Sequence, residues 1–278
     1  MARARRTTRT TRGSRWLRWG LGVLGVGFAC VAYVYLTIPD VRVLATTDPD
    51  TTAFIELRRD EAHEAGKSFT LRRRWVPYNR ISNQLKRAVI VAEDSAFFEH
   101  EGLDYEQIRA SIEDSLEDGG AIRGASTITQ QLAKNLYLSP SRNPLRKLRE
   151  LIITRRLEAA LTKRRIFEIY LNSIEWGDGI FGCEAAARAY FGKPAAQLGA
   201  SEAALLAGAI INPRMHSPAK PTRRLLRRQQ TILRRMGGAE PPADVPAAPA
   251  SAPAAPAIPP EVPPPVPPPP PPPPSSSS

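Results

Sequence analysis

Apolar residues return at helical spacing over most of the middle of the chain. From Ser82 to Met236 they recur every three or four residues, which is the period of an amphipathic helix. An earlier segment, residues 51–78, alternates apolar and polar positions enough to predict a small β-hairpin. The pattern therefore predicts a mainly α fold with a β fringe.

The two ends of the chain follow neither pattern. Residues 21–38 are free of charge, and eighteen residues of helix measure about 27 Å, close to the roughly 30 Å hydrocarbon core of a bilayer. Residues 239–278 are rich in Pro, Ala and Ser, which is typical of a polyproline II spacer or a disordered tail. We expect five segments in all: a basic cytoplasmic tail at 1–20, a transmembrane helix at 21–38, a linker with a small strand-like segment at 39–74, one catalytic-sized domain at 75–238, and the tail at 239–278.

Charge orients the predicted anchor. Seven arginines and no acidic residue occur before residue 20, and positively charged flanks stay on the cytoplasmic side of a span. The domain would therefore lie outside the cytoplasm. The alternative is a cleaved signal peptide, but its apolar region would be about 7 to 15 residues long, and only "VLA" at 43–45 resembles a cleavage site.

The net charge of +12 does not by itself indicate nucleic-acid binding, because the anchor's flank carries seven of those charges. The remaining basic excess lies at 142–165 and 220–235 and suits anionic lipid or a phosphorylated substrate. Cys30 lies in the predicted span and Cys183 in the domain. We therefore expect no disulfide and no cysteine-based metal site.

The first candidate chemistry lies in "AVIVAEDSAFFEHEG", residues 88–102. Glu93 and Asp94 stand where an apolar run stops, so Glu93 should be poorly solvated, which raises the pKa of a carboxyl group toward that of a general base. Asp94 is expected to support Glu93, and His100 to be a structural hydrogen-bonding residue. The alternative for either acid is a solvated residue at a helix end.

The second stretch is "RGASTITQQLAKNLYL", residues 123–138. Thr127 followed three residues later by Gln130 is a capping-box pattern, so a helix should begin here with uncovered backbone N–H groups that can bind an anion. Lys134 follows one turn after Gln130 on the same face. The alternative is an ordinary capped helix with a solvated lysine.

The third stretch covers residues 143–172, "NPLRKLRELIITRRLEAALTKRRIFEIYLN". In a helix Glu150 shares a face with Arg146, Lys147 and Thr154, so cations should favour its ionised form. Two carboxylates in unlike environments can divide proton transfer from charge stabilisation. The alternative is a solvated helix face of alternating charge.

These residues belong to an ordered set of five segments that resembles the motifs of the peptidoglycan glycosyltransferases, glycosyltransferase family 51. The resemblance runs from about Trp75 to Met236 and is closest to members with one membrane anchor and one catalytic domain. "SPAK" at 217–220 matches a transpeptidase Ser-x-x-Lys, but no Lys-Thr-Gly follows. The segments are "EDSAFFEHEG" (93–102), "RGASTITQQLAKN" (123–135), "RKLRE" (146–150), "KRRIFEIYLN" (163–172) and "RRQQTILRRM" (227–236).

The resemblance implies a lysozyme-like helical fold that polymerises lipid II into β-1,4-linked glycan strands, with inversion and release of undecaprenyl pyrophosphate. It implies that Glu93 is the general base and that Glu150 organises the pyrophosphate, with a divalent cation, Mg²⁺ or Mn²⁺, as an open question. The further residues expected to bind substrate are Asp94, Ser126, Thr127, Gln130, Gln131, Lys134, Asn135, Arg142, Arg146, Lys147 and Asn172.

The implied partners are lipid II, the growing glycan chain, the membrane and cell-wall synthesis proteins. The implied location is the bacterial inner membrane, with a single span and a periplasmic domain. Residues 104–124 are expected to form a mobile lid. Two rival functions stay open: a lytic glycosidase of the same fold, and a non-enzymatic membrane-anchored cell-wall scaffold.

Overall fold

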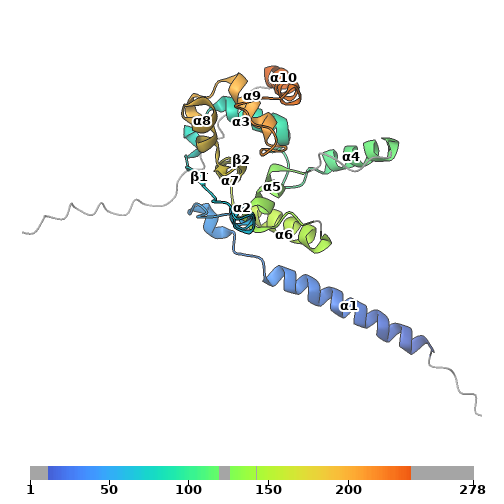
Figure 1. Cartoon of the computed structure of the whole chain (residues 1–278). Helices are drawn as coiled ribbons and strands as arrows, with labels where there is room; N and C mark the ends of the chain where they lie inside the picture. Colours follow the sequence, from blue (N-terminus) through green and yellow to red (C-terminus); the bar gives the residue numbers. More distant parts are fainter. Residues whose placement is uncertain (1–11, 119–125, 142, 239–278) are drawn as a thin grey trace, which may run out of the picture. The chain divides into compact units, whose positions relative to one another are not determined.

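The computed structural model describes residues 12–118, 126–141 and 143–238. Arg142, residues 119–124 of the expected lid, the first eleven residues and the proline-rich tail lie outside this part. The described chain is mainly helical, as predicted (Figure 1). Its α-helices are α1 (Arg12–Leu36), α2 (Ala53–Glu64), α3 (Asn83–Glu93), α4 (Tyr105–Asp118), α5 (Ile128–Tyr137), α6 (Pro144–Ala160), α7 (Lys163–Ser173), α8 (Cys183–Phe191), α9 (Ala200–Ala209) and α10 (Arg223–Gly238). The 3₁₀ helices are η1 (Arg42–Ala45), η2 (Tyr78–Arg80) and η3 (Ala195–Gln197), and the strands are β1 (Arg72–Arg73), β2 (Glu175–Gly177) and β3 (Ile180–Phe181).

Short polar side chains fix where many of these helices begin. A Ser, Thr or Asn before the first helical residue accepts a hydrogen bond from a backbone N–H that has no partner inside the helix, typically contributing about 1 kcal/mol. The residues that cap α2, α3, α5, α6 and α7 in this way are Thr52, Ser82, Thr127, Asn143 and Thr162.

The hairpin predicted within residues 51–78 is wrong, because most of that segment's first half is helix α2. Thr52 caps α2 by accepting a hydrogen bond from the N–H of Ile55 (3.1 Å). The residues that follow are good helix formers, and Glu56 in the first turn favours the positive end of the helix dipole. Only Arg72 and Arg73 enter a sheet.

That sheet has three short strands in the order β1-β3-β2. β1 runs parallel to β3, with Arg72 opposite Ile180, and β2 is antiparallel to β3. Because the partners of β1 lie more than a hundred residues away, local alternation could not predict the pairing. The sheet remains a fringe on a helical core, as expected.

Fully buried aromatic rings join the helices that carry the candidate site. Phe97 lies 5.5 Å from Phe167, and Phe167 lies 6.4 Å from Tyr170, measured between ring centroids. All three residues are inaccessible to solvent, and burial of each such side chain contributes roughly 1.5–3 kcal/mol. Helices α6 and α7 pack against α5, and α9 and α10 against α3. This packing fixes the positions of the C-terminal end of α3 and the start of α5.

Helix α1 contains most of the segment predicted to cross a membrane. Among the described residues, no helix combines the length and the apolarity that a membrane span requires. Side chains of α6 contact the C-terminal end of α1: Arg156 donates to the carbonyl oxygen of Tyr35 (2.8 Å), and its guanidinium carbon lies 4.3 Å from the centre of the Tyr35 ring. Arg149 donates to the hydroxyl of Thr37 (2.8 Å).

Candidate active site

Glu93 ends helix α3, and only 11% of its side chain is exposed. One carboxylate oxygen, Oε2, accepts a hydrogen bond from Gln131 Nε2 (3.0 Å), and Oε1 accepts one from Arg228 Nη2 (3.2 Å). Burial raises the pKa of the Glu93 carboxyl above its ordinary value, and the hydrogen bond from Gln131 and the charge of Arg228 oppose that rise. The prediction of a poorly solvated carboxylate is confirmed. A carboxyl group with a raised pKa is suited to accept a proton near neutral pH.

Gln131 connects Glu93 to the core. Its Oε1 accepts a hydrogen bond from the hydroxyl of Tyr170 (2.8 Å), while its Nε2 donates to Glu93. Tyr170 is fully buried, and burial raises the pKa of its hydroxyl well above the ordinary value. The hydroxyl therefore stays protonated and acts as a donor.

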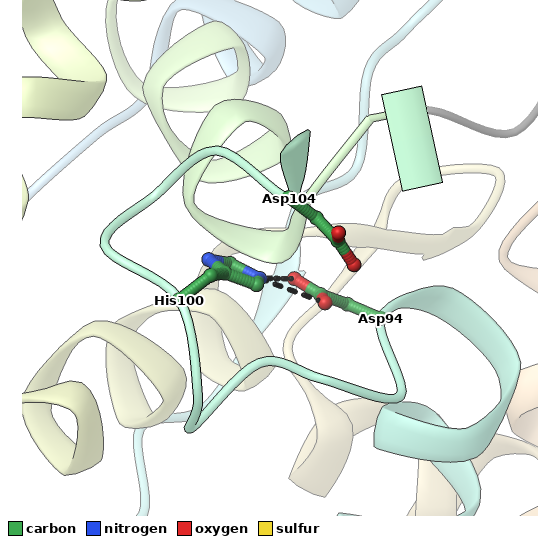
Figure 2. A group of neighbouring side chains, drawn as sticks. All are labelled: Asp94, His100 and Asp104. Atoms are coloured by element: carbon green, nitrogen blue, oxygen red, sulfur yellow. Dashed lines mark hydrogen bonds and ion pairs between the residues drawn. The ribbon is translucent and has the colours of Figure 1, made fainter. Parts of the chain in front are cut away.

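Asp94 is buried, and its hydrogen bonds run to residues other than Glu93, so any support that it gives Glu93 is indirect. Its carboxylate accepts a hydrogen bond from the N–H of Ile128 (2.9 Å) and lies 2.9 Å from His100 Nε2 (Figure 2). His100 Nδ1 accepts a hydrogen bond from the N–H of Gly102 (3.1 Å), so the ring proton lies on Nε2 and points at Asp94. Asp94 thus ties the loop after α3 to the first turn of α5. The prediction of a structural role for His100 is confirmed.

Asp94, His100 and Asp104 are the one group of metal-ligand side chains found in the described part of the chain, with ligand atoms within 4.8 Å of one another (Figure 2). The set fits Mg²⁺ or Mn²⁺ poorly, because these ions prefer several oxygen ligands in octahedral geometry. His100 Nε2 carries a proton, and the Asp94 oxygens face Nε2 and the N–H of Ile128. Asp104 Oδ1 accepts a hydrogen bond from the N–H of Gln107 (2.8 Å). We therefore assign no divalent cation to this cluster.

The predicted capping box at the start of α5 is confirmed. Thr127 Oγ1 accepts from the N–H of Gln130 (3.2 Å), and Gln130 Oε1 accepts from the N–H of Thr127 (3.0 Å). The expectation of uncovered N–H groups is wrong for these two residues and for Ile128, because Asp94 accepts from the N–H of Ile128. The first turn of α5 uses these three backbone donors inside the protein, so they are not available to an anionic ligand.

Two asparagines expected to bind substrate are buried and bond to backbone groups. Asn172 is fully buried, accepts from the N–H of Val76 (3.0 Å) and donates to the carbonyl oxygens of Val76 and Glu168 (2.9 Å each). Asn135 is buried and donates to the carbonyl oxygen of Gln131 (2.8 Å). The hydrogen bonds of Asn172 hold the segment before η2 against α7. The side chains that cap α5 are also buried, whereas Ser126 is exposed.

A second carboxylate, Glu150 of α6, lies among cations as predicted. It is 4% exposed, and its two oxygens each lie 2.5 Å from a cationic nitrogen, one from Arg146 and one from Lys147. Both oxygens are therefore engaged by side-chain charge, which leaves a poor ligand for a divalent cation. The alternative of a solvated charged face is wrong for Glu150, although the Lys147 side chain is 53% exposed.

Lys134 of α5 lies within electrostatic range of both carboxylates. Burial lowers the pKa of its ammonium group, Glu150 and Glu93 oppose that change, and Arg146 and Lys147 reinforce it. Its Nζ lies 6.0 Å from the centre of the Phe54 ring of α2. The structure therefore brings Glu93, Gln131, Lys134 and the Glu150 cluster to one region.

Sequence reasoning missed three contributors to this region. Arg228 lies in a segment that resembles the fifth motif, but α10 contains six arginines, and the sequence gives no reason to choose Arg228 among them. Tyr170 is one of several apolar positions on α7. Phe54 was assigned to a strand. Each reaches the region through contacts that no local sequence pattern encodes.

The part of the chain that forms this region is similar to known proteins. Residues 61–237 match the sequence model of a family described as Transglycosylase. The chain belongs to that family. The matched region contains both carboxylates, Lys134 and Arg228, so the resemblance noted from the five segments is confirmed.

Several relatives are about half identical to this chain and are named biosynthetic peptidoglycan transglycosylase. The protein from Laribacter hongkongensis (strain HLHK9) is 51% identical over 189 residues, which cover 68% of this chain and 83% of the relative. The protein from Janthinobacterium sp. (strain Marseille) is 51% identical over 195 residues, covering 70% and 84%. The protein from Aromatoleum aromaticum is 53% identical over 169 residues, covering 61% and 74%.

The raised pKa of Glu93 predicts that this residue lowers stability at neutral pH. Because the folded state binds the carboxyl proton more tightly than the unfolded state, stability is greatest below the ordinary value of 4.5 and falls as pH rises through the folded pKa. Glu93→Gln should therefore raise the melting temperature at pH 7 by a few degrees, since about 1 kcal/mol corresponds to roughly 2–4 °C in a domain of this size. The gain should vanish below about pH 4.5. Exposed Glu99→Gln is the control, and a Glu93→Gln protein that melts below the wild type at pH 7 would contradict the expectation.

Proposed function

We propose that this protein polymerises lipid II, a disaccharide-peptide carried on undecaprenyl pyrophosphate, into β-1,4-linked glycan strands. The observation that carries the proposal is the pairing of a poorly solvated carboxylate, Glu93, with a cationic group formed by Lys134, Arg146 and Lys147. Such a pair suits a reaction that takes a proton from a hydroxyl and expels a phosphate-type leaving group. The names of the relatives support the same substrate class.

Glu93 acts as the general base in this proposal. It removes the proton of the acceptor sugar's 4-hydroxyl, whose oxygen forms a bond to the anomeric carbon of the donor. The bond from that carbon to the pyrophosphate oxygen breaks, and the pyrophosphate leaves with the electron pair. One displacement inverts the anomeric centre, and the proton remains on Glu93.

The cationic group stabilises the negative charge that develops on the leaving pyrophosphate. Arg146 and Lys147 are held by Glu150, so their charges are in place before the reaction. Glu150 has the role of positioning these cations, since both of its oxygens are engaged by them. In this scheme the side-chain cations supply the positive charge that faces the leaving pyrophosphate.

We further propose that α1 holds the domain at the membrane in which the lipid substrate resides, as a single inner-membrane anchor with the domain in the periplasm. The support comes from the arginines before residue 20, the absence of charge in 21–38, and the exposure of Leu24, Val26 and Phe28 at 72%, 72% and 77%. Apolar side chains exposed to this extent are stable in contact with lipid.

Two rival activities make different demands on the same region. A lytic glycosidase would cleave glycan and needs no cationic group for a pyrophosphate. A scaffold protein would not depend on Glu93 at all. Incubation of the detergent-solubilised protein with lipid II and added glycan separates the three functions. A polymerase yields polymer, and a lytic glycosidase cleaves the added glycan and leaves lipid II unpolymerised. A scaffold protein gives no reaction.

Glu93→Gln should abolish polymer synthesis while binding of lipid II persists. The amide cannot take up the proton, and loss of a general base costs about 10²- to 10⁴-fold in rate. Polymer is measured by gel separation of labelled glycan, and binding by the fluorescence of a labelled lipid II. Exposed Glu99→Gln should polymerise normally, and a near-normal rate for Glu93→Gln would overturn the assignment of the base.

Lys134→Ala and Lys147→Ala should weaken binding of pyrophosphate-bearing donors far more than binding of uncharged glycan. Each substitution removes a charge that contacts the leaving group, and hydrogen bonds to charged groups contribute about 1.5–3 kcal/mol. Lys193→Ala is the matched control, because Lys193 pairs with Glu202 away from Glu93 and Glu150. Equal loss of affinity for both ligands would refute the pyrophosphate role.

Gly25→Arg should release the protein from the membrane fraction. A charge at the centre of a span costs about 2.5–3.5 kcal/mol on insertion scales. A reporter fused after Gly238 should be active outside the cytoplasm only. If the wild type and Gly25→Arg divided equally between the membrane and soluble fractions, the proposed anchor would be excluded. A reporter that is active in the cytoplasm would exclude it as well.

A further inference from the structure

The two carboxylate oxygens of Glu93 are held from two different helices. Gln131 of α5 donates to Oε2 (3.0 Å), and Arg228 of α10 donates to Oε1 (3.2 Å). An ionised carboxylate can accept about four hydrogen bonds. One donor on each oxygen therefore fixes the plane of the group and leaves each oxygen with capacity to accept a further hydrogen bond.

The amide of Gln131 has a defined orientation because of Tyr170. An amide can be reversed with little change in shape, but a reversed Gln131 would point its oxygen at Glu93 and its NH₂ at Tyr170. The fully buried Tyr170 hydroxyl donates to Oε1 (2.8 Å). A reversed amide would set its oxygen against the Glu93 carboxylate and would make the Tyr170 hydroxyl an acceptor. Tyr170 thereby favours the orientation in which Gln131 presents a donor to Glu93.

Arg228 reaches Glu93 across the packing of α9 and α10. Gly208 of α9 lies beside its stem: a Cβ at that position would be in ordinary contact with Arg228 Cγ (3.7 Å) and would crowd Leu225 Cδ1 (3.1 Å). The Arg228 side chain is 33% exposed, and its buried Nε has no acceptor among the described residues. Glu93 is therefore the acceptor that orients this guanidinium.

We propose that Tyr170 and Arg228 are positioning residues for Glu93: Tyr170 acts through Gln131 on one oxygen, and Arg228 acts on the other and favours the ionised form. This inference rests on the proposed role of Glu93 as the base. Neither residue contacts the reacting atoms in this scheme. Both set the geometry and the proton affinity of the group that does.

Few other charges face Glu93 from the surrounding elements. Lys134 of α5 lowers the pKa of the Glu93 carboxyl through its charge, and Arg228 does so through charge and hydrogen bonding. The neighbouring Asp94 points away toward His100 and Ile128. Helix α9, which also packs on α3, carries one ionisable side chain, Glu202, which bonds to Lys193 and the N–H of Gly199. Arg228 is therefore the charge whose removal should act most directly on Glu93.

The first test is the pH dependence of kcat/KM for polymerisation of lipid II. The base works only when deprotonated, so activity falls as pH drops below the pKa of Glu93. Removing an opposite charge at hydrogen-bond distance raises a carboxyl pKa by about one unit or more. Arg228→Met should move the acidic limb of the profile to higher pH by about that much, and Arg228→Lys should restore most of its position.

Arg227→Met is the matched control for Arg228→Met. It removes the same charge from the neighbouring position of α10, where the side chain is exposed. Its acidic limb should coincide with that of the wild type. If Arg228→Met and Arg227→Met gave the same limb, the role of Arg228 would be overturned.

The second test compares two tyrosine hydroxyls. Tyr170→Phe should lower kcat roughly fivefold or more with little change in KM, and should also move the acidic limb to higher pH, because Gln131 loses its fixed orientation. Tyr190→Phe removes a hydroxyl that donates to the carbonyl oxygen of Trp176 (3.1 Å) and should leave the limb unchanged. If the pH profile of kcat/KM had the same acidic limb for Tyr170→Phe as for Tyr190→Phe, the role of Tyr170 would be overturned.

A third measurement does not depend on activity. The ¹³C resonance of the Glu93 carboxyl, assigned by its absence from Glu93→Gln, should titrate at higher pH in Arg228→Met and Tyr170→Phe than in the wild type. If the wild type makes no polymer but this titration moves, the proposed function fails and the positioning contacts stand. If the wild type polymerises lipid II and the titration does not move, the positioning contacts fail alone.

Discussion

The geometry of the candidate active site depends on a buried carboxylate that is given no part in proton transfer. Asp94 accepts the N–H of Ile128 at the start of α5 and faces His100, which in turn accepts the N–H of Gly102. Thr127 closes the same loop by donating to the carbonyl oxygen of Gly102 (2.8 Å). Leaving a buried hydrogen-bonding group without its partner costs about 1–3 kcal/mol, and more when the group is charged. The end of α3 and the start of α5 are thus locked together, and Gln131, one turn into α5, meets Glu93.

The same region balances burial against charge. Burial raises the pKa of Glu93 and lowers that of Lys134, so each residue is pushed toward its neutral form. Arg228 and Lys134 act against the change at Glu93, and Glu150 and Glu93 act against the change at Lys134. Because these groups oppose one another's shifts, the region can keep a proton acceptor and a cation close together without full solvation. Two ionisable groups of opposite charge can therefore share one region.

The sequence predicted the parts of this site that depend on neighbouring residues. The capping box of Thr127 and Gln130 and the cations around Glu150 follow from spacings of three and four residues along a helix. The poor solvation of Glu93 follows from the apolar run before it. Periodicity also predicted the helical core, but it assigned the residues of α2 to a hairpin, because alternation over a few residues does not distinguish a strand from a short capped helix.

The remaining contacts join residues far apart in the chain, and no local pattern contains them. Arg228 and Glu93 are separated by 135 positions, Asn172 and Val76 by 96, and Asp94 and Ile128 by 34. For this reason Asn172 was expected at the substrate and is instead a buried link between segments. Several residues expected from the motifs gather in one region of the structure, but the motifs do not separate the side chains that face this region from those that support it.

The use of the first N–H groups of α5 inside the protein has a consequence for the movement of a polymer through the site. Backbone donors hold an anion at a fixed point, whereas a lysine ammonium on a four-carbon stem can follow an anion over several ångströms. Lys147 pairs with Glu150 through its Nζ, while 53% of its side chain is exposed to an approaching ligand. In the proposed reaction, a strand that grows by repeated addition would have to carry its terminal phosphate groups forward after each cycle. Binding by side-chain cations would suit that step better than binding by fixed backbone donors.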